Sequence, residues 1–293
     1  MRSARLQLRS LLPVGVVLIA MLSVQTGASI AKALFAVAGP IGVVTVRIGF
    51  GTVILCLALR PWRVRVPPEA RLSLAVYGLA LGTMNVLYYQ ALERLPVGLA
   101  VAVEFIGPLA VAVLTSRRRS DFAWIALAAI GLVLLLPVLP QVSHVSVTGV
   151  AFALGAGACW ALYIVFGQRA GRHLGTQTVA LGSVISAVLV VPFGLLHAGS
   201  IVLSRQVLLP GLAVAVLSTA LPYTLEMFAL TRMPTRTFGV LMSLEPAVGA
   251  LSGLLLLGEK LTPAQSAAIL LVMAASAGAT ITAHRSVPAP VPD

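Results

Sequence analysis

The sequence predicts an all-α integral membrane protein with ten transmembrane helices, arranged as two inverted five-helix repeats. Composition is the first observation: 59% of the 293 residues are hydrophobic and only 10% are charged, whereas soluble domains are about 25% charged. The second is that apolar runs long enough to cross a bilayer recur along the chain. The third is an internal repeat that relates the two halves. A chain this apolar has too little polar surface to cover a soluble core.

Ten runs have the roughly 20 residues that a helix needs to cross a bilayer. We place them near residues 11–31, 39–59, 72–91, 97–115, 122–140, 147–167, 177–197, 207–229, 237–257 and 262–282. The connections between them are short and leave no room for a soluble domain. The first run follows a basic start and resembles a signal peptide, but its length and the spans after it favour a first transmembrane helix.

Basic residues alternate between the two sets of loops. Fifteen of the 20 lysines and arginines lie in the two tails and in every second loop, and only four lie in the opposite loops. Because basic loops stay in the cytoplasm, the alternation predicts an even number of spans. Both tails, residues 1–10 and 283–293, are then cytoplasmic. The net charge of +12 is therefore interpreted as a topology signal, and no nucleic acid is expected as a partner.

The internal repeat appears when the chain is compared with itself at an offset of 138 residues. ALERLP (91–96) then aligns with ALTRMP (229–234), and Pro108 aligns with Pro246. The predicted modules are residues 11–140 and 147–282, with five spans each. An odd number of spans inverts the second module, an architecture typical of secondary transporters whose substrate site lies between the repeats.

Five polar or ionisable residues fall within the predicted spans: Arg47, Asn85, Glu104, Glu226 and Glu245. An ionised group at a helix centre costs at least about 2.5–3.5 kcal/mol, so such groups face a wet cavity, pair with each other or stay protonated. Arg47 either holds a substrate carboxylate or forms a structural ion pair. Glu104 and Glu245 either carry a proton or a substrate ammonium, or merely bond backbone groups freed at a proline kink.

Glu226 is a weaker candidate for proton coupling, since Tyr88 aligns with it in the first repeat. Trp160 and Tyr223 are candidate walls of the substrate cavity, although ordinary helix packing also explains aromatic residues at these positions. The sequence contains no His, Cys and carboxylate group with the spacing of a metal site, no P-loop and no nucleophile–base pair. We therefore expect no cofactor, no metal and no enzymatic activity, and a gradient rather than ATP as the energy source.

Several stretches resemble a known family. RIGFGTVIL (47–55) and LLLLGEKLT (254–262) resemble motifs of the EamA family in the drug/metabolite transporter superfamily. Within that superfamily, three further stretches are similar to bacterial inner-membrane threonine/homoserine exporters: VAVEFIGPLAVAV (101–113), ALGAGACWALYIVFGQRAG (153–171) and STALPYTLEMFALTRMPTRTFG (218–239). The resemblance covers nearly all of the chain except its tails.

The resemblance implies ten spans, a central cavity and export of small amino acids in exchange for protons. A small amino acid is a zwitterion, and from the buried charges themselves we expect Arg47 to bind its carboxylate and Glu104 or Glu245 to bind its ammonium group. Alternatively, the same fold exports another metabolite or a drug, because a fold does not fix a substrate. The sequence leaves open whether the chain works in the lipid bilayer as a monomer or a homodimer.

Overall fold

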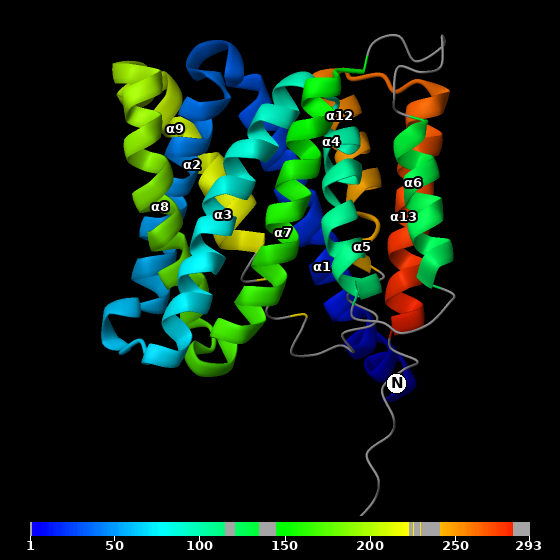
Figure 1. Cartoon of the computed structure of the whole chain (residues 1–293), viewed down its shortest axis with the longest axis horizontal. Coiled ribbons are helices and arrows are strands. Elements are labelled where there is room, and N and C mark those ends of the chain that lie inside the picture. The colour runs from blue at the N-terminus through cyan, green and yellow to red at the C-terminus, as the bar shows by residue number, and fades with distance from the viewer. Residues whose placement is uncertain are drawn as a thin grey trace, which may run out of the picture.

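The protein is a bundle of roughly parallel and antiparallel helices in a computed structural model (Figure 1). The structure describes residues 2–114, 121–134, 145–222, 225, 229 and 241–283. Within these ranges every regular element is helical. The predicted all-α class is therefore confirmed.

The first half of the chain begins with two long helices that are separated by a single turn residue, Leu34. Its elements are α1 (Arg2–Ala33), α2 (Phe35–Leu59), the short η1 (Pro61–Arg63), α3 (Pro68–Arg94), α4 (Val97–Glu104), α5 (Ile106–Leu114) and α6 (Asp121–Val133). α2 contains a kink at Gly39, whose φ of 65° is one that glycine adopts readily. The proline that follows, Pro40, lacks an N–H group, so the helix resumes there without losing a further hydrogen bond.

The second half contains α7 (Val147–Leu174), α8 (Gln177–Ala198), η2 (Gly199–Leu203), α9 (Arg205–Ala215), η3 (Val216–Ala220), α12 (Glu245–Leu257) and α13 (Pro263–Ala283). The element η3 is a π-helical turn that continues α9. Wide turns of this kind are rare and are often found at functional sites. The predicted span near 207–229 is therefore helical in its described first part, but irregular where the chain approaches Ser218.

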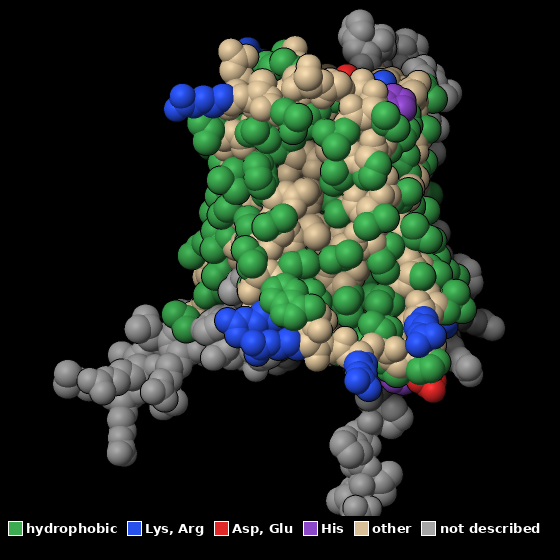
Figure 2. Space-filling model, turned by 90° about the vertical axis from the view of Figure 1, so that its left-hand side faces the viewer, with side chains coloured by type: hydrophobic (Ala, Val, Ile, Leu, Met, Phe, Trp, Pro, Cys, Tyr) green, Lys and Arg blue, Asp and Glu red, His purple; other side chains and the backbone are tan. Residues whose placement is uncertain are grey.

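Among the described residues, five helices are long and apolar enough to cross a membrane: Leu12–Ala33, Phe35–Leu59, Pro68–Arg94, Val147–Leu174 and Gln177–Leu203. Large apolar side chains face outward on these helices, including Leu57, Val188 and Leu196. Figure 2 shows the result on one face, a broad apolar band with basic side chains at its margins. The protein is therefore a multi-pass membrane protein, while the count of ten spans stays a prediction.

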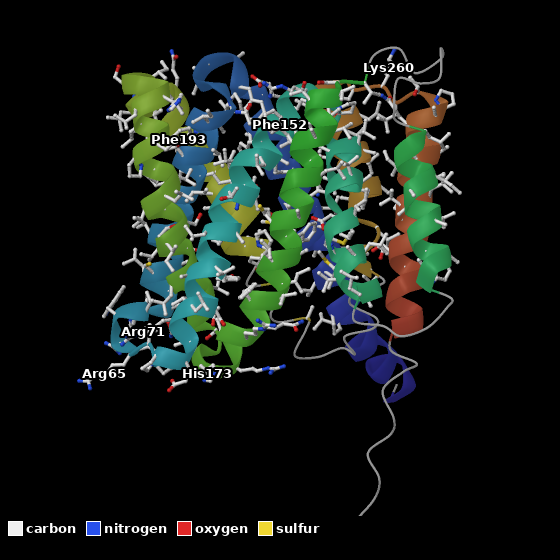
Figure 3. The ribbon with its side chains drawn as sticks, in the orientation of Figure 1. Arg65, Arg71, Phe152, His173, Phe193 and Lys260 are labelled. Atoms are coloured by element: carbon white, nitrogen blue, oxygen red, sulfur yellow. The ribbon has the colours of Figure 1, made fainter. Side chains whose placement is uncertain are left out.

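The ends of the bundle differ in the way that the loop charges predict. Arg65, Arg71 and His173 lie at one end and Lys260 lies at the other (Figure 3). The sequence assigned Arg65 and Arg71 to one side and Lys260 to the opposite side. This separation agrees with the predicted alternation, and the orientation of the bundle in the membrane stays a prediction.

Two helical segments are interrupted at related positions. A turn at Phe105 separates α4 from α5, and a turn at Ser243–Leu244 precedes α12. Phe105 and Ser243 are 138 residues apart, the same offset that aligns the two halves of the sequence. Pro108 and Pro246 follow these turns, in the first turn of a helix, where a missing N–H group costs no intrahelical hydrogen bond.

The interrupted segments meet in the interior, because α4 packs against α12 and α5 against α7. The contacts are close. A β-carbon added at Gly98 would lie 2.5 Å from that of Ala250, and one at Gly107 would overlap the carbonyl oxygen of Gly157. Glycine is required at these crossings because it lets two helix backbones approach without a side chain between them. The arrangement of the two halves as inverted repeats stays a prediction.

Candidate functional site

Both predicted acids lie at the interruptions of these segments. Glu104 is the last residue of α4, and Glu245 is the first residue of α12. Each retains only 7% of its surface exposure. Helix ends leave backbone groups without intrahelical partners, so the turns at Phe105 and Ser243–Leu244 place polar backbone and two carboxyl groups deep in an apolar bundle. Glu104 and Glu245 are thus alike in burial and in lying beside an interruption, with Glu104 before the turn and Glu245 after it.

Glu245 is held by a residue of the first helix. The Nε2 group of Gln25, in α1, donates a hydrogen bond of 3.1 Å to Oε1 of Glu245. The same seam between α1 and α12 contains Ser252, whose hydroxyl donates to the backbone oxygen of Gln25 at 3.0 Å and lies 3.0 Å from the hydroxyl of Ser29. All four side chains are buried. A row of polar contacts therefore runs along an otherwise apolar helix pair.

Arg47 lies in the middle of α2 and contacts two other helical segments. Its Nη1 donates to Oδ1 of Asn85 in α3 at 2.8 Å, and its Nη2 donates to the backbone oxygen of Ser218 in η3 at 3.2 Å. The amide of Asn85 is oriented by its own bond to the backbone oxygen of Leu81, at 2.8 Å. The guanidinium also lies over the ring of Tyr89, 5.4 Å from its centre, at cation–π distance.

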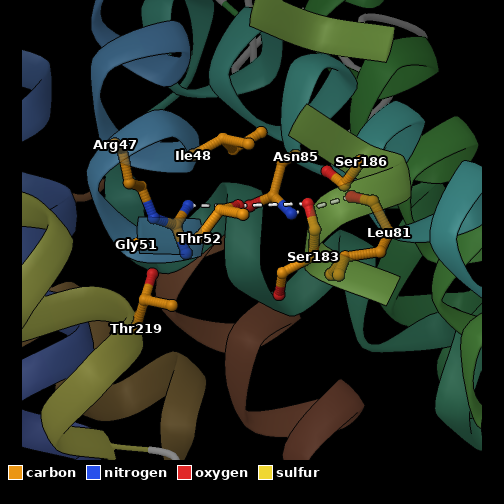
Figure 4. Close-up of a pocket in the computed structure, with 9 residues that line it drawn as sticks. All are labelled: Arg47, Ile48, Gly51, Thr52, Leu81, Asn85, Ser183, Ser186 and Thr219. Carbon is orange, nitrogen blue, oxygen red and sulfur yellow. Dashed lines mark hydrogen bonds between the residues drawn. The ribbon is translucent and has the colours of Figure 1, made fainter. Parts of the chain in front are cut away.

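A small pocket opens beside Arg47. The residues that line it come from α2, α3, α8 and the π-helical turn: Arg47, Ile48, Gly51, Thr52, Leu81, Asn85, Ser183, Ser186 and Thr219. Figure 4 shows the guanidinium and the side-chain oxygens of Asn85, Ser183 and Thr219 gathered around it. A cation with hydroxyl and amide groups around it can bind a carboxylate in a position that excludes bulk solvent.

The acids and Arg47 belong to one electrostatic cluster. Glu104 interacts with both Glu245 and Arg47, and Tyr88 interacts with all three of these residues. Tyr88 and Tyr89 are neighbours in α3, with ring centres 6.2 Å apart. The intramembrane polar residues that the sequence singled out and the structure describes are thus gathered rather than scattered. The cluster contains one cation and two carboxyl groups, the two kinds of partner that a zwitterion requires.

Trp160 lies beside the first interruption. Its ring meets that of Phe105 edge to face, with centres 4.9 Å apart, and Phe105 directly follows Glu104. This position is compatible with the predicted cavity wall and equally with helix packing. Tyr223 and Glu226 lie outside the described residues, so their predicted roles stay predictions. Among the described residues, no group of three or more His, Cys, Asp and Glu side chains could hold a metal ion.

The sequence analysis missed Gln25, Ser29 and Ser252. For Gln25 the sequence contained a signal, because it is a polar amide in the middle of the apolar run 11–31, as Asn85 is in the run 72–91. Asn85 was among the predicted residues and Gln25 was not. Only the packing of α1 on α12 brings it to Glu245.

A multi-pass helical bundle with a buried cluster of charged and polar side chains is typical of membrane transporters. The chain belongs to the EamA-like transporter family, whose sequence profile matches residues 11–136 and 147–281. It is 55% identical over 274 residues to the threonine/homoserine exporter RhtA of Escherichia coli K12, covering 94% of this chain and 93% of the relative. It is 56% identical to the exporter of the same name from Salmonella typhimurium LT2, over the same shares of the two chains.

A more distant relative and a solved structure complete the comparison. A probable amino-acid metabolite efflux pump of Salmonella typhimurium LT2 is 31% identical over 71% of this chain and 76% of its own. A crystal structure with a TM-score of 0.58 and 21% identity covers 92% of this chain and 98% of its own. That structure supports the fold alone.

Proposed function

We propose that this protein is a secondary active transporter that exports small amino acids of the threonine and homoserine type in exchange for protons. The observation that carries the proposal is the cluster that joins Arg47 to Glu104 and Glu245 inside the bundle. The identity of 55% to an exporter named for threonine and homoserine supports the substrate class. No comparable observation supports an enzymatic function.

Each part of the cluster would contact a different part of the substrate. Arg47 would bind the carboxylate from the pocket beside α2, because a guanidinium forms planar paired hydrogen bonds with a carboxylate. Glu245 or Glu104 would bind the ammonium group. Protons would compete with the substrate for the same acid, since two buried carboxyl groups near each other do not readily ionise together. That competition couples the movement of protons to the movement of substrate.

Access to the site would alternate between the two sides of the membrane. Two inverted modules that rock against each other would expose a fixed site first to one side and then to the other. The close glycine crossings between α4 and α12 and between α5 and α7 suit such motion, because they bring helix backbones together at the centre of the bundle. In this proposal the two modules pivot at these glycine crossings, which lie beside Glu104 and Glu245.

The proposal is tested with purified protein in vesicles whose lumen is acidic. External threonine or homoserine should accumulate in the vesicles as protons leave, and a protonophore should abolish the accumulation. Glu245→Gln should insert into the membrane normally and lose the proton-driven accumulation. Glu93→Gln is the matched control, because Glu93 pairs with Arg94 at 2.7 Å on an exposed surface outside the cluster.

Two outcomes would contradict parts of the proposal. Normal proton-driven accumulation by Glu245→Gln would remove Glu245 from the coupling step. Transport of neither amino acid by the unaltered protein, together with transport of another metabolite or a drug, would favour the alternative substrate class on the same fold.

A further inference from the structure

Gln25 is a buried amide with one half of its hydrogen-bonding capacity in use. Its side chain is 1% exposed. Its Nε2 group donates to Glu245 at 3.1 Å, while its Oε1 atom is buried without a hydrogen-bond partner. A buried polar atom without a partner costs about 1–3 kcal/mol. Most buried polar atoms in proteins have a hydrogen-bond partner, so this oxygen beside Glu245 is an exception that calls for an explanation.

Gly249 packs directly against this oxygen. A β-carbon added at Gly249, one turn after Glu245 on α12, would lie 3.1 Å from Oε1 of Gln25. Any larger side chain at this position would cover the oxygen.

We propose that Oε1 of Gln25 accepts a hydrogen bond from the side-chain hydroxyl of the substrate. Gln25 is then a specificity-determining residue that selects hydroxylated amino acids over apolar ones of the same shape. This inference rests on the proposed function and adds to it the group that recognises the substrate side chain. Neither the sequence pattern nor the relatives' names assign that role.

The chemistry of the neighbouring groups favours a hydroxyl over the ammonium group as the partner. Glu245 lies on one side of Gln25 at hydrogen-bond distance, and Glu104 interacts with Glu245. A carboxylate is a stronger partner for an ammonium than a neutral amide oxygen is. The amide oxygen is left for a neutral donor, and the side-chain hydroxyl is the neutral donor that threonine and homoserine share.

The consequence for selectivity follows from the cost of an unpaired acceptor. A hydroxyl pairs with Oε1, whereas the methyl group of an isosteric amino acid leaves it unsatisfied. Sites built to bond a substrate hydroxyl discriminate strongly against analogues that lack it. Threonine and valine are such a pair, and so are homoserine and norvaline. The unaltered protein should therefore prefer the hydroxylated member of each pair by about tenfold or more.

The experiment is counterflow in proteoliposomes with threonine, valine, homoserine and norvaline as the four probes. Gln25→Met keeps the shape of the side chain and removes the acceptor. Its preference for the hydroxylated member of each pair should fall about tenfold, to near equality. The ratio of the two rates is the readout, because loss of the bond to Glu245 will lower both rates together.

Ser29→Ala is the matched control. Ser29 lies one turn further along α1, is equally buried and contacts α12 through Ser252. It makes no described contact with Glu245, so the variant should keep the selectivity of the unaltered protein. Should Gln25→Met not reach the membrane, Gln25→Asn retains the amide but withdraws it by one methylene, and the same fall in ratio is expected.

The outcomes separate this inference from the proposed function. Threonine counterflow by the unaltered protein with an unchanged ratio in the Gln25 variants would overturn the role of Gln25 alone. An equal fall in ratio for Ser29→Ala would also overturn it, because the effect would then belong to the α1–α12 contact. No counterflow of threonine or homoserine by the unaltered protein would overturn the proposed function and this inference together.

Discussion

Lys32 and Glu259 form an ion pair of 2.6 Å that ties three helix ends together. Lys32 lies in the last turn of α1, and Glu259 follows α12 at the end of the bundle where Lys260 is seen in Figure 3. The second carboxylate oxygen of Glu259 accepts the backbone N–H of Val97, the first residue of α4, at 2.8 Å. One side chain therefore caps α4 and neutralises the cation of α1.

Removal of Lys32 should weaken this junction. The two side chains are 20% and 15% exposed, so the pair is partly buried. Exposed ion pairs add little to the free energy of unfolding, whereas the disruption of a buried pair lowers it strongly. We expect Lys32→Met to lower the free energy of unfolding by about 1–3 kcal/mol, seen as a lower melting temperature in detergent. Arg94→Met, which disrupts the more exposed pair with Glu93, is the control and should change the melting temperature little. Equal melting temperatures for the two variants would contradict the prediction.

The bond between Arg47 and Asn85 predicts an opposite effect of one substitution on transport and stability. Asn85→Asp should form an ion pair with Arg47, at the 2.8 Å contact that now exists, and so occupy the guanidinium that the substrate carboxylate needs. We expect counterflow to fall about tenfold or more with a melting temperature that is unchanged or higher. Asn85→Ser is the uncharged control. Undiminished counterflow by Asn85→Asp would argue against Arg47 as the carboxylate site.

Arg47→Lys tests the geometry of the same residue. Lysine keeps the positive charge but loses the planar fork that contacts Asn85 and Ser218 at once. Counterflow should fall by about tenfold because at least one charge-assisted hydrogen bond is lost. The apparent affinity for substrate, measured by competition, should fall with it. A variant with normal affinity would show that charge alone suffices at this position.

The two acids should differ from Glu93 in their response to pH. Glu104→Gln removes one of two neighbouring buried carboxyl groups and leaves a neutral side chain of the same shape. Counterflow by the unaltered protein should vary with pH, since protons and substrate compete for the acids, and the variant should show a flatter profile. A profile equal to that of Glu93→Gln would remove Glu104 from proton coupling.

Gly107→Ala should disrupt the crossing of α5 and α7. The added β-carbon would overlap the backbone carbonyl of Gly157, and backbone cannot move aside as the end of a flexible side chain can. We expect a loss of about 1–3 kcal/mol or more, measured as a lower melting temperature and a lower yield in the membrane. Gly171→Ala, on α7 with no atom within 4 Å of the added carbon, is the control and should be neutral or slightly stabilising.

Much of the fold follows from the sequence because its signals are local. Each predicted span falls mainly on helix where the structure describes it, with turns at Phe105 and Ser243–Leu244, since a run of about 20 apolar residues needs no distant partner to be stable as a helix in a bilayer. Pro108 and Pro246 indicated where two of these helices are interrupted. The sequence also identified Arg47, Glu104 and Glu245 as costly residues, because an ionisable residue inside an apolar run can be recognised from that run alone.

The contacts of the site could not be predicted in the same way. Gln25 and Glu245 are 220 residues apart, and Lys32 and Glu259 are 227 apart. Which side chains meet depends on how each helix is rotated about its axis and how closely it packs. Those features are set jointly by all the small and large residues along a contact, so no single stretch of sequence contains them.

The sequence by itself determined the membrane class, the family motifs and the charged residues that an apolar bundle must accommodate, because these depend on composition and on short runs. Only the tertiary structure decided that Glu245 meets Gln25, that Arg47 meets Asn85 and that Lys32 meets Glu259. Hydrogen bonds and ion pairs act over about 3 Å, and only the packed helices bring residues from distant parts of the chain within that range.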